Sequence, residues 1–405
     1  MEHTRCVVVG GGPAGMMTGL LLARAGVEVT VLEKHGDFLR DFRGDTVHPS
    51  TLRLLDELGL GDRFAALEQR SLTRMRMIVA GQTIVAADFT RIPGRHKRIA
   101  MVPQWDFLTM LAEAARAEPT FTLRMSTAAT APIVTDGVVR GVRVQGPDGP
   151  GDLRADLVIA CDGRDSVIRA GAGLRQRAFD VPMDVWWVRV PAPPDRAGGG
   201  EVFGRFEAGA VAVTMDRGDY LQTSYLIPKG ADARFRAAGL DRLRGQLHAL
   251  FGWDAAALDA IASWDDVKLL EVTMGRLDRW HTPGLLCLGD AAHTMSPVGG
   301  VGVNLAIQDA VAAARILAEP LRRGPVPDRV LARVGRRRHF PTAVTQRSQL
   351  GEHATLLEPA LAGTLTRVPA PLRAVGRVPA LAGLAAYVGG VGVRPEHAPA
   401  FARRP

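Results

Sequence analysis

The segment that ends at Glu33 constrains the fold most, because a strand, a glycine-rich turn, a helix and a second strand follow one another closely. The apolar run Cys6–Val9 is of the kind that a parallel sheet buries on both faces. A glycine turn, Gly10–Gly15, follows it, and apolar residues at helical spacing continue to Ala25. Residues 27–32 are a second apolar run, which ends at Glu33. This order predicts a complete βαβ unit within an α/β protein that has a doubly wound sheet.

Three glycines in the turn, Gly10, Gly12 and Gly15, form the pattern G-x-G-x-x-G. In dinucleotide-binding turns the first glycine allows a sharp bend, the second lets the backbone approach a pyrophosphate, and the third lets the helix pack on the strand. Glu33 follows at the end of the second apolar run, where a carboxylate can accept both hydroxyls of a ribose. The alternative is a glycine-rich turn without a ligand. The pattern favours a dinucleotide but does not separate FAD from NAD.

A second strand end of this kind lies further along the chain. The apolar run Leu157–Cys161 is followed by Asp162 and Gly163, and then by Ser166 and Arg169 at intervals of three residues. A local interpretation is that Asp162 or Ser166 only caps the next helix, because short polar side chains accept hydrogen bonds from the first helical N–H groups. Taken alone, the segment favours this local interpretation.

A third strand end occurs where the apolar residues 285–288 lead into Gly289 and Asp290. A glycine-rich loop then enters a long helix that we expect over Asn304–Leu321. The alternative is that Asp290 is a helix cap and that His293 is an ordinary core histidine. One ligand shared by three glycine-bearing strand ends explains the sequence better than three coincidences.

The composition describes a folded protein and limits its partners. Of the 405 residues, 47% are hydrophobic and 23% are charged, and the net charge is +8. Such a charge suits nucleic acid, anionic lipid or an anionic small molecule. The densest basic clusters, Arg95–Arg98 and Arg336–Arg338, are short and have no aromatic residues among them, which argues against nucleic acid. We therefore interpret most arginines as ordinary surface and expect an anionic cofactor.

No pattern indicates export, a transmembrane helix or a metal site. The longest uncharged apolar stretch, Val378–Val393, is shorter than the roughly 20 residues of a membrane span and contains glycines. The N-terminal residues lack a signal-peptide pattern. The three cysteines form no C-x-x-C pair, and the ten histidines show no H-E-x-x-H spacing. We expect a cytoplasmic protein without disulfides or metal.

The middle of the chain changes in character. Strand-like runs at 185–190, 210–214 and 221–227 precede a helix expected over Arg234–Leu250, and residues 73–98 are also strand-like. We predict a discontinuous cofactor domain, an inserted and mostly antiparallel substrate-binding sheet, and a C-terminal helical segment. Their residues, in that order, are 1–72, 98–178 and 268–330; 73–97 and 179–267; and 331–405.

The three motifs together resemble those of a known family. They read GxGxxG, DGxxSxxR and GDAAHxxxP, at residues 10–15, 162–169 and 289–297. In order and approximate spacing they are similar to motifs of the single-component FAD-dependent aromatic hydroxylases. This para-hydroxybenzoate hydroxylase-like group A of flavoprotein monooxygenases includes ubiquinone-biosynthesis and polyketide-tailoring hydroxylases. The resemblance covers about residues 1–330 and implies a Rossmann-like FAD domain.

The resemblance also implies a reaction. NAD(P)H would reduce FAD, O2 would add to the reduced flavin as a C4a-hydroperoxide, and one oxygen atom would enter an aromatic or polycyclic, polyketide- or quinone-like substrate. A second dinucleotide fingerprint is absent from the sequence, which fits a nicotinamide that visits the same flavin. The expected partner is a small aromatic molecule, and the expected assembly is a monomer or homodimer. Peripheral membrane contact of the tail remains open.

The family's functional positions can be carried over onto matching residues. The glycine turn would hold the FAD pyrophosphate, Glu33 the adenosine ribose, and Asp290 the ribityl or pyrophosphate region. Arg43 and Pro297 are the expected catalytic positions, where they would position the flavin; no side chain is assigned as a base. The expected cofactor-binding residues are Gly10, Gly12, Pro13, Ala14, Gly15, Glu33, Lys34, Arg43, Gln104, Asp162, Arg169, Asp290, Pro297, Gly302, Val303 and Asn304.

The substrate is expected where the two domains meet, over the flavin. Met75, Met77, Trp187 and Tyr225 are the candidates for its walls. The equal alternative is that they belong to the core of the inserted sheet, because the sequence alone does not say which strand face a residue occupies.

Two related chemistries are disfavoured. Trp186-Trp187 does not match the W-x-W-x-I-P pattern of flavin halogenases, and the F-x-G-x-x-x-H-x-x-x-W-P fingerprint of the usual Baeyer–Villiger class is missing. Epoxidation or isoprenoid reduction on the same scaffold remains an alternative. So does a membrane-docked flavoprotein that uses the Arg336 cluster and the apolar tail.

Overall fold

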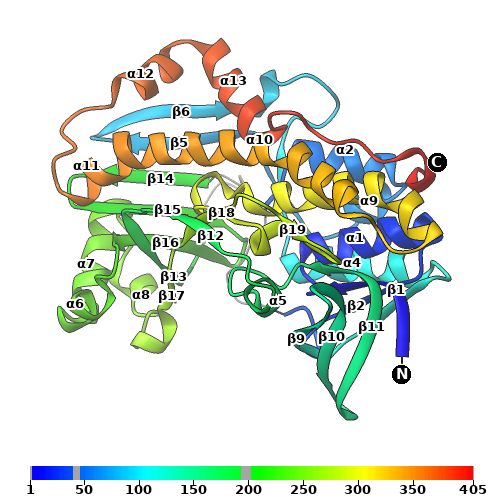
Figure 1. Cartoon of the computed structure of the whole chain (residues 1–405). Coiled ribbons are helices and arrows are strands. Elements are labelled where there is room, and N and C mark those ends of the chain that lie inside the picture. Colours follow the sequence, from blue (N-terminus) through cyan, green and yellow to red (C-terminus); the bar gives the residue numbers. More distant parts are fainter. Residues whose placement is uncertain (1, 40–45, 193–201, 405) are drawn as a thin grey trace.

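Two sheets form the body of the chain, and a long C-terminal helix runs from one to the other (Figure 1). The computed structural model describes residues 2–39, 46–192 and 202–404. It confirms the expected α/β class, with one largely parallel sheet, one largely antiparallel sheet and a helical C-terminal part.

The first sheet contains the three strands that precede the motifs. Its order is β19-β20-β11-β1-β2-β8, and every pair along this path is parallel except β19 with β20. The chain passes from β1 to β2 on one side and later returns to β11 on the other, so a ligand crevice is expected beside β1. The strands are β1 (Glu2–Val9), β2 (Val29–Leu32), β8 (Phe121–Arg124), β11 (Gly149–Ala160), β19 (His281–Thr282) and β20 (Leu285–Cys287).

Three helices pack together beside this sheet. Helix α1 (Pro13–Arg24) contacts both α4 (Gln104–Arg116) and α9 (Gly302–Arg323), and its residues from Ala14 to Ala23 are all buried. The stretch Val298–Arg323 has the length and hydropathy of a membrane span, but 78% of that apolar window is buried inside the protein. It is therefore the central helix of this part of the fold.

An antiparallel ribbon extends the first sheet. Strands β9 (Ala128–Thr135) and β10 (Val138–Gly146) pair with each other, and β10 pairs with β11, so the three strands form a meander. The ribbon projects away from the helices at the lower edge of Figure 1.

The second sheet is assembled from segments far apart in the sequence. Its order is β17-β13-β16-β15-β14-β5-β6, and only the β14–β5 pair is parallel. Lys268–Leu270, just beyond the predicted boundary of the inserted sheet, provides its edge strand. The strands are β5 (Arg74–Val79), β6 (Gln82–Asp88), β13 (Met183–Pro191), β14 (Val202–Glu207), β15 (Ala210–Asp216), β16 (Tyr220–Pro228) and β17 (Lys268–Leu270).

Two sequence-based expectations were wrong in detail. The helix expected over Arg234–Leu250 is two helices, α6 (Asp232–Ala237) and α7 (Leu240–Phe251), because Gly239 adopts a φ of +89° between them. The strand-like character of 73–98 ends with β6, since Pro93 and Gly94 lie in an irregular segment after a short 3-10 turn.

Two three-stranded sheets and several short helices complete the fold. Helix α2 begins at Pro49, and all these elements connect or flank the strands already described. They are β3 (Thr46–Val47), β4 (Arg70–Leu72), β7 (Ile99–Met101), β12 (Gln176–Phe179), β18 (Met274–Leu277), β21 (His293–Thr294), α2 (Pro49–Glu57), α3 (Gly61–Ala65), α5 (Val167–Gly171) and α8 (Ala255–Leu258).

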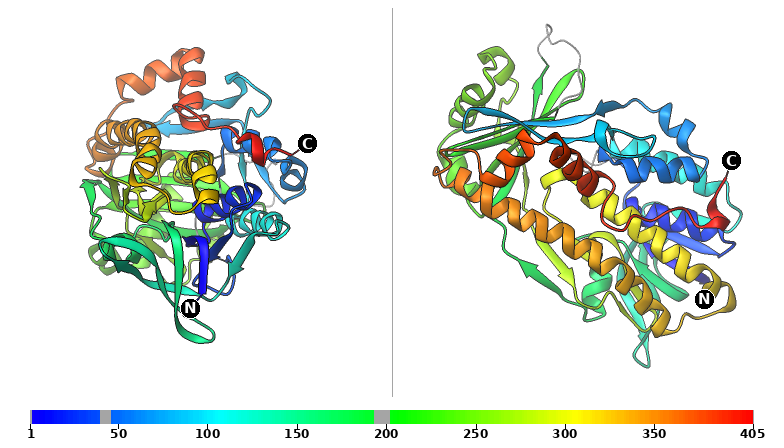
Figure 2. Two further views of the ribbon diagram at one scale, coloured as in Figure 1. Left: turned by 45° about the vertical axis from the view of Figure 1, so that its right-hand side comes forward. Right: turned by 90° about the horizontal axis from the view of Figure 1, so that it is seen from above.

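The C-terminal helices link the two sheets. Helix α10 (Asp328–Glu352) begins beside α9, continues through a π-helical turn (His353–Leu357) into α11 (Glu358–Leu361), and reaches the second sheet there (Figure 2). Helices α12 (Ala370–Arg377) and α13 (Pro379–Gly390) then pack on β6 at the upper edge of Figure 1.

Candidate functional site

The three motif strands end side by side and at the same level. Val9, the last residue of β1, is in register with Ala160 at the end of β11, and Ala160 is in register with Cys287 at the end of β20. The glycine turn, the Asp-Gly segment and the Gly-Asp segment therefore leave one edge of the sheet together. This placement supports the prediction that one ligand is shared by the three motifs.

Close backbone approach explains several of the motif glycines. A Cβ on Gly10, whose φ is +103°, would collide with the carbonyl oxygen of Cys161, and a Cβ on Gly15 would collide with that of Gly10. A Cβ on Gly289 would lie 3.2 Å from the Cβ of Ala14 and 3.3 Å from that of Ala306. The first turns of α1 and α9 thus converge on the Gly-Asp segment.

Gly12 is different, because nothing lies within 4 Å of the Cβ that it lacks. It is the N-cap of α1, so the first N–H groups of that helix point toward this open space. Gly163, with a φ of +90°, also borders open space. A pyrophosphate suits such a cradle, since a helix N-terminus offers both donors and a positive dipole. The residues present therefore fit the phosphates of a dinucleotide.

Glu33 is buried at the end of β2 and already has backbone partners. Its carboxylate accepts hydrogen bonds from Gly11 N at 2.9 Å and His35 N at 3.0 Å, and its Oε1 lies 2.6 Å from His35 Nδ1. Glu33 therefore fixes the glycine turn, and its expected contact with a ribose remains a prediction. Lys34, beside it, is exposed.

The Asp-Gly segment combines both interpretations of its sequence. Ser166 is the N-cap of α5 and donates a hydrogen bond to Asp162 at 2.5 Å, as the local interpretation expected. Arg169, however, donates to the carbonyl oxygen of Ala291 at 3.2 Å and so ties this segment to the Gly-Asp segment. Burial raises the pKa of Asp162 despite the hydrogen bonds that oppose this shift.

The other expected cofactor residues occupy the same neighbourhood with different roles. Asp290 lies half-buried in a short 3-10 turn after β20, and Gln104 is the first residue of α4. The side-chain oxygen of Asn304 accepts hydrogen bonds from Ser50 at 2.9 Å and Thr51 at 2.7 Å, so it anchors α2, and its expected contact with the cofactor remains a prediction. Arg43 lies outside the described residues.

Pro297 begins the glycine loop that leads into α9. Gly299 and Gly300 have φ values of +77° and +60°, and the loop is held to β3 because Thr46 donates to the carbonyl oxygen of Gly300 at 3.1 Å. Gly302 and Val303, the first residues of α9, are half-buried. The N-terminus of α9 therefore opens beside this loop and can stabilise negative charge there.

One face of the second sheet is turned toward the glycine loop. Five residues lie in register across five neighbouring strands, and Val298 of the loop packs against the same cluster as the two largest of them, Trp187 and Met77. We call this set the substrate-facing row, because we expect a substrate to lie over it; it consists of Trp187, Ser224, Val213, Gly204 and Met77. Trp187, Val213 and Met77 are half-buried, and Met75 follows on the same face of β5.

Tyr225 does not belong to this face, so grouping it with Trp187 was wrong. It pairs across the strands with Trp186, and the two rings are 6.3 Å apart in the core beneath α6, α7 and α8. The reason is the two-residue period of strands, which places neighbours on opposite faces. Ser224 and Val213, which the sequence did not indicate, occupy the face instead.

A family profile described as "FAD binding domain" matches residues 3–348, which include all three motifs. The chain belongs to this family. It is 35% identical over 384 residues to 6-methylpretetramide 4-monooxygenase from Streptomyces rimosus, covering 93% of this chain and 90% of that protein. FAD is therefore its cofactor, and this chain is an FAD-dependent monooxygenase.

Further comparisons agree with this assignment. The flavoenzyme is 30% identical over 319 residues to 12-dehydrotetracycline 5-monooxygenase/anhydrotetracycline 6-monooxygenase from Streptomyces rimosus subsp. rimosus, but spans 60% of that protein's length. Its fold matches the crystal structure of p-nitrophenol 4-monooxygenase from Pseudomonas putida DLL-E4, with a TM-score of 0.74 and 21% identity over 96% of this chain and 95% of that one.

A buried ionic network behind the Gly-Asp segment escaped the sequence analysis. The fully buried Asp309 of α9 lies 2.6 Å from His293 Nε2, accepts from Arg338 Nε at 2.9 Å and accepts from Gly289 N at 3.3 Å. Burial by itself raises the pKa of Asp309, but the charges and hydrogen bonds of His293 and Arg338 lower it by more than burial raises it. The net shift of the pKa is therefore downward. An acid among the apolar residues of the predicted helix was the available signal.

Arg337 and Arg338 of the flavoenzyme's Arg336–Arg338 cluster form internal ion pairs, which disfavours the alternative in which this cluster docks on a membrane, although Arg336 is exposed. Arg338 is 1% exposed, and Arg337 Nε donates to the buried Glu396 at 2.6 Å. Arg315 of α9 also lies 3.2 Å from Glu396. These pairs fasten the chain after α13 to α9 and α10.

Helix α10 also clamps the segment that runs from the Gly-Asp motif to the glycine loop. Gln349 accepts from Ser296 N at 3.2 Å and donates to the carbonyl oxygens of Ser296 at 3.0 Å and Val298 at 2.8 Å. His353 Nε2 lies 2.9 Å from Ser296 Oγ, and Gln346 donates to Thr294 O at 3.0 Å. Gln346, Gln349 and His353 are spaced to share one helix face.

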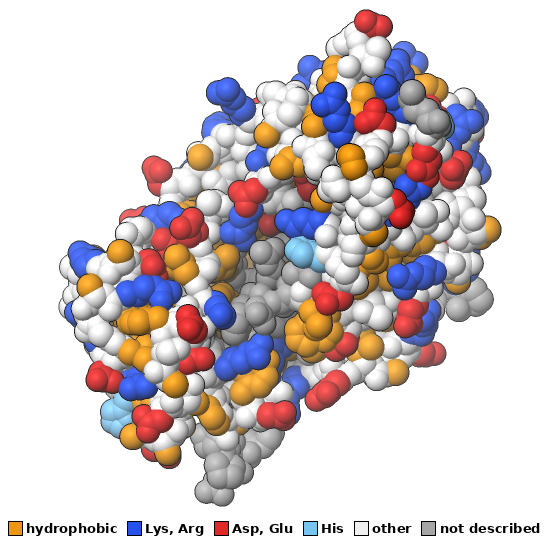
Figure 3. All heavy atoms as spheres, turned by 90° about the horizontal axis from the view of Figure 1, so that it is seen from below, with side chains coloured by type: hydrophobic (Ala, Val, Ile, Leu, Met, Phe, Trp, Pro, Cys, Tyr) orange, Lys and Arg blue, Asp and Glu red, His pale blue; other side chains and the backbone are white. Residues whose placement is uncertain are grey.

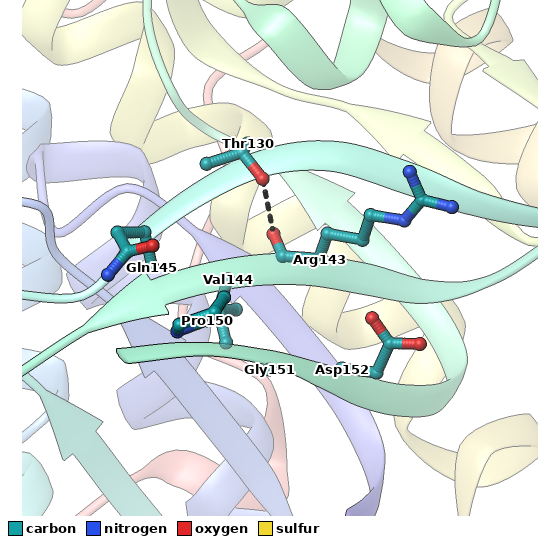
Figure 4. Close-up of a pocket in the computed structure, with 7 residues that line it drawn as sticks. All are labelled: Thr130, Arg143, Val144, Gln145, Pro150, Gly151 and Asp152. Carbon is teal, nitrogen blue, oxygen red and sulfur yellow. Dashed lines mark hydrogen bonds between the residues drawn. The ribbon is translucent and has the colours of Figure 1, made fainter. Parts of the chain in front are cut away.

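Away from the motif strand ends, the described surface shows mixed charges and a groove on the ribbon. Seen from below, basic and acidic side chains are interspersed, which supports the interpretation of most arginines as ordinary surface (Figure 3). A groove of about 360 Å³ lies on the β9–β11 ribbon between Arg143 and Asp152, with Thr130 donating to Arg143 O at 3.4 Å (Figure 4). It is remote from the motif strand ends. In the described part of the chain, no group of His, Cys, Asp or Glu is placed to hold a metal ion.

Proposed function

We propose that this flavoenzyme uses NAD(P)H and O2 to hydroxylate a fused-ring aromatic substrate of the polyketide type. In the balanced reaction, substrate, O2, NAD(P)H and a proton give hydroxylated substrate, water and NAD(P)+. The observation that carries the proposal is the substrate-facing row, which is largely apolar and whose three apolar side chains are half-buried. The relationship to 6-methylpretetramide 4-monooxygenase supports a substrate with several fused rings.

FAD, when bound and reduced, would supply the electrons that activate O2, and O2 itself is the source of the oxygen atom that enters the substrate. The protein's own residues hold and shield the reacting parts. The N-termini of α1 and α9 offer donors to negative charge, the first at the phosphates and the second beside the Pro297 loop. We propose that Asp290 and Glu33 bind cofactor hydroxyls and that Asp162 and Arg169 border the path of the nicotinamide.

The chemistry of the substrate-facing row favours a large planar substrate. Trp187 can stack on an aromatic ring, and Met77 and Met75 are polarisable side chains that adapt to irregular outlines. Ser224 donates its hydroxyl to the carbonyl oxygen of Val213 at 3.1 Å. The row itself contains no acid or histidine, so we propose that the ring hydroxyls of the substrate provide the activation for attack by oxygen.

Two adjacent tryptophans provide a matched test. Trp187→Ala removes a ring from the substrate-facing row, and we expect kcat/KM for the aromatic substrate to fall by roughly tenfold or more, since burial of such a ring is worth about 1.5–3 kcal/mol. Trp186→Phe is the control, because Trp186 lies on the opposite face and donates to Asp232 at 2.7 Å. It should lower stability and leave kcat/KM nearly unchanged in the folded fraction.

The substrate class is tested with the purified, FAD-loaded protein. A panel of monocyclic phenols and fused-ring aromatics, including 6-methylpretetramide, is screened for stimulated NADH or NADPH oxidation and for incorporation of one labelled oxygen from 18O-enriched O2. Incorporation into fused-ring members only is the expected result. Turnover of monocyclic phenols alone, or consumption of substrate without added oxygen, would contradict the proposal. A cytoplasmic location, where reduced nicotinamide is available, accords with this reaction.

A further inference from the structure

The chain after α11 is unusual because it contains no acidic residue over a long stretch. Residues 359–395 lack Asp and Glu entirely, although 42 of the 405 residues are acidic, so about four are expected in such a stretch. Four arginines lie within it, namely Arg367, Arg373, Arg377 and Arg394. The stretch includes α12 and α13, which therefore form a helical pair with positive charge only.

The inner face of this helical pair packs against the rest of the protein. Gly376, Gly383 and Gly390 recur at seven-residue intervals, and Cβ atoms on them would come within 2.7–3.0 Å of Ile84, Arg91 and Phe89. The lack of side chains lets both helices approach β6 and the turn after it closely. Ala382 and Ala386 of α13 are buried along the same contact. The orientation of the pair is thereby fixed, and its other face is turned outward.

The outer face exposes aliphatic side chains beside the arginines. Val378 is 45% exposed, Leu381 36% and Leu384 58%. Arg373 and Arg377 are exposed as well. We call this set the α12–α13 face. Monomeric surfaces expose single apolar side chains routinely, but three of them close together, next to two cations and within a stretch that has no acid, form a patch.

Its position and dimensions indicate how the patch could be used. The helical pair lies at the upper edge of the molecule in Figure 1, on the far side from the ribbon. Helix α13 has 12 residues and is about 18 Å long, too short to cross a hydrocarbon core of about 30 Å. A pair of short helices, with aliphatic side chains on α13 and arginines on α12, can bind instead in the plane of a bilayer surface, with the apolar side chains below the headgroups.

We propose that the α12–α13 face docks the enzyme on an anionic lipid bilayer. Val378, Leu381 and Leu384 enter the boundary between headgroups and acyl chains, while Arg373 and Arg377 contact lipid phosphates. We choose an anionic bilayer as the partner because the charges are complementary: residues 359–395 contain arginines and no acid that would repel an anionic surface. A second copy of the chain fits less well, because two such faces would bring like charges together and a stable interface buries about 800 Å² on each partner. This inference is independent of the substrate proposed above.

Vesicle flotation with the FAD-loaded protein tests the inference. Vesicles of phosphatidylcholine alone are compared with vesicles that also contain phosphatidylglycerol, over a salt titration. We expect binding to the anionic vesicles that weakens with salt, and little binding to the neutral ones. Leu381→Glu/Leu384→Glu should abolish flotation, and Arg373→Glu and Arg377→Glu should each reduce affinity by at least roughly fivefold.

Matched controls come from other surfaces of the same chain. Phe340→Glu changes an apolar side chain that is 54% exposed on α10, and Arg140→Glu changes an exposed arginine on β10. Both should float as the unchanged protein does, and all variants should retain FAD. Equal flotation of the face and control variants would overturn the inference. So would a lack of binding to anionic vesicles, or a dimer in light scattering that only the face variants dissociate.

Discussion

Asp309 in α9 accepts a hydrogen bond from the guanidinium of Arg338 in α10 at 2.9 Å, and both side chains are removed from solvent. The same carboxylate reaches Gly289 N and His293, so one buried acid joins the C-terminal helices to the Gly-Asp motif. Arg338 in turn lies 3.7 Å from Glu396, beyond α13. The Gly-Asp motif is therefore held in place from behind by the C-terminal part of the chain.

Breaking this pair should be costly. Asp309→Asn removes the carboxylate that accepts a hydrogen bond from Arg338 and leaves this buried cation with only Glu396, at 3.7 Å, as a counter-charge. We expect the free energy of unfolding to fall by about 3–5 kcal/mol. Asp328→Asn is the control, because Asp328 pairs with Arg279 at 3.0 Å in a pair that is largely exposed, and such pairs contribute about 0–1 kcal/mol. Urea unfolding of both variants measures the difference. Similar losses in the two variants would show that the network is not structural.

Because the pKa of Asp309 is shifted, the stability that its ion pairs contribute should depend on pH, and the direction of this dependence can be stated. The folded-state pKa lies below its usual value, so the stabilisation is present above the unfolded-state pKa and is lost as the pH falls through the folded-state value. The acid limb of the stability curve should therefore be shallower in Asp309→Asn than in the unchanged protein.

Gln349 holds the segment that leads into the glycine loop, so its replacement should uncouple NAD(P)H oxidation from hydroxylation. Gln349→Leu leaves Ser296 N, Ser296 O and Val298 O without their partner, and each buried unpaired group costs about 1–3 kcal/mol. We expect weaker FAD retention and more peroxide released per NAD(P)H oxidised, because the loop beside α9 is no longer held. Gln145→Leu, at an exposed position on the ribbon, is the control. Unchanged FAD affinity and peroxide yield in Gln349→Leu would contradict a positioning role.

The sequence predicted the cofactor side of this fold because its signals are local. An apolar strand, a glycine turn and a helix start occupy consecutive residues, so the turn at Gly10–Gly15 could be located without knowing its neighbours. The buried network of Asp309, Arg338 and Glu396 could not be found in this way. Asp309 and Arg338 belong to different helices, and Glu396 lies beyond three further helices in the chain. Nothing local marks such pairs before the helices are packed.

The substrate-facing row shows a second limit of sequence reasoning. Trp186 and Trp187 are adjacent and chemically alike, yet one lies in the core beneath α7 and the other on the face toward the glycine loop. Neighbouring residues of a strand point to opposite faces of the sheet, but which of the two points to which face depends on the helices that cover the sheet. The register with Tyr225 and Ser224 settled that phase.

Asp290 provides a direct test of the cofactor cradle. Asp290→Ala should weaken FAD binding by about 1–3 kcal/mol, the usual cost of leaving buried polar partners unpaired. The apoprotein is titrated with FAD and followed by flavin fluorescence, with Asp152→Ala on the exposed ribbon as the control. If Asp290→Ala keeps full FAD occupancy and activity after dialysis, the residue serves only the local turn.

His48 supplies a pH-dependent prediction at milder acidity. It is buried at the N-cap of α2, its Nδ1 lies 3.0 Å from the carbonyl oxygen of Gly389, and burial lowers its pKa to about 4 from an ordinary value of 6.5. The folded state therefore resists protonation that the unfolded chain accepts. Its contribution to stability is complete above pH 6.5 and is lost progressively as the pH falls toward 4, by up to about 3 kcal/mol.

His48→Gln keeps a hydrogen-bonding side chain of similar reach but removes this titration. The free energy of unfolding of the variant should lose part of its decline between pH 6.5 and 4, while above pH 6.5 the two curves should run parallel. Burial also lowers the pKa of His281 and His353, so the variant should retain a residual slope from them. Urea unfolding monitored by tryptophan fluorescence at closely spaced pH values measures the slopes. An identical slope in the variant and the unchanged protein would mean that His48 exchanges its proton equally in the folded and unfolded states.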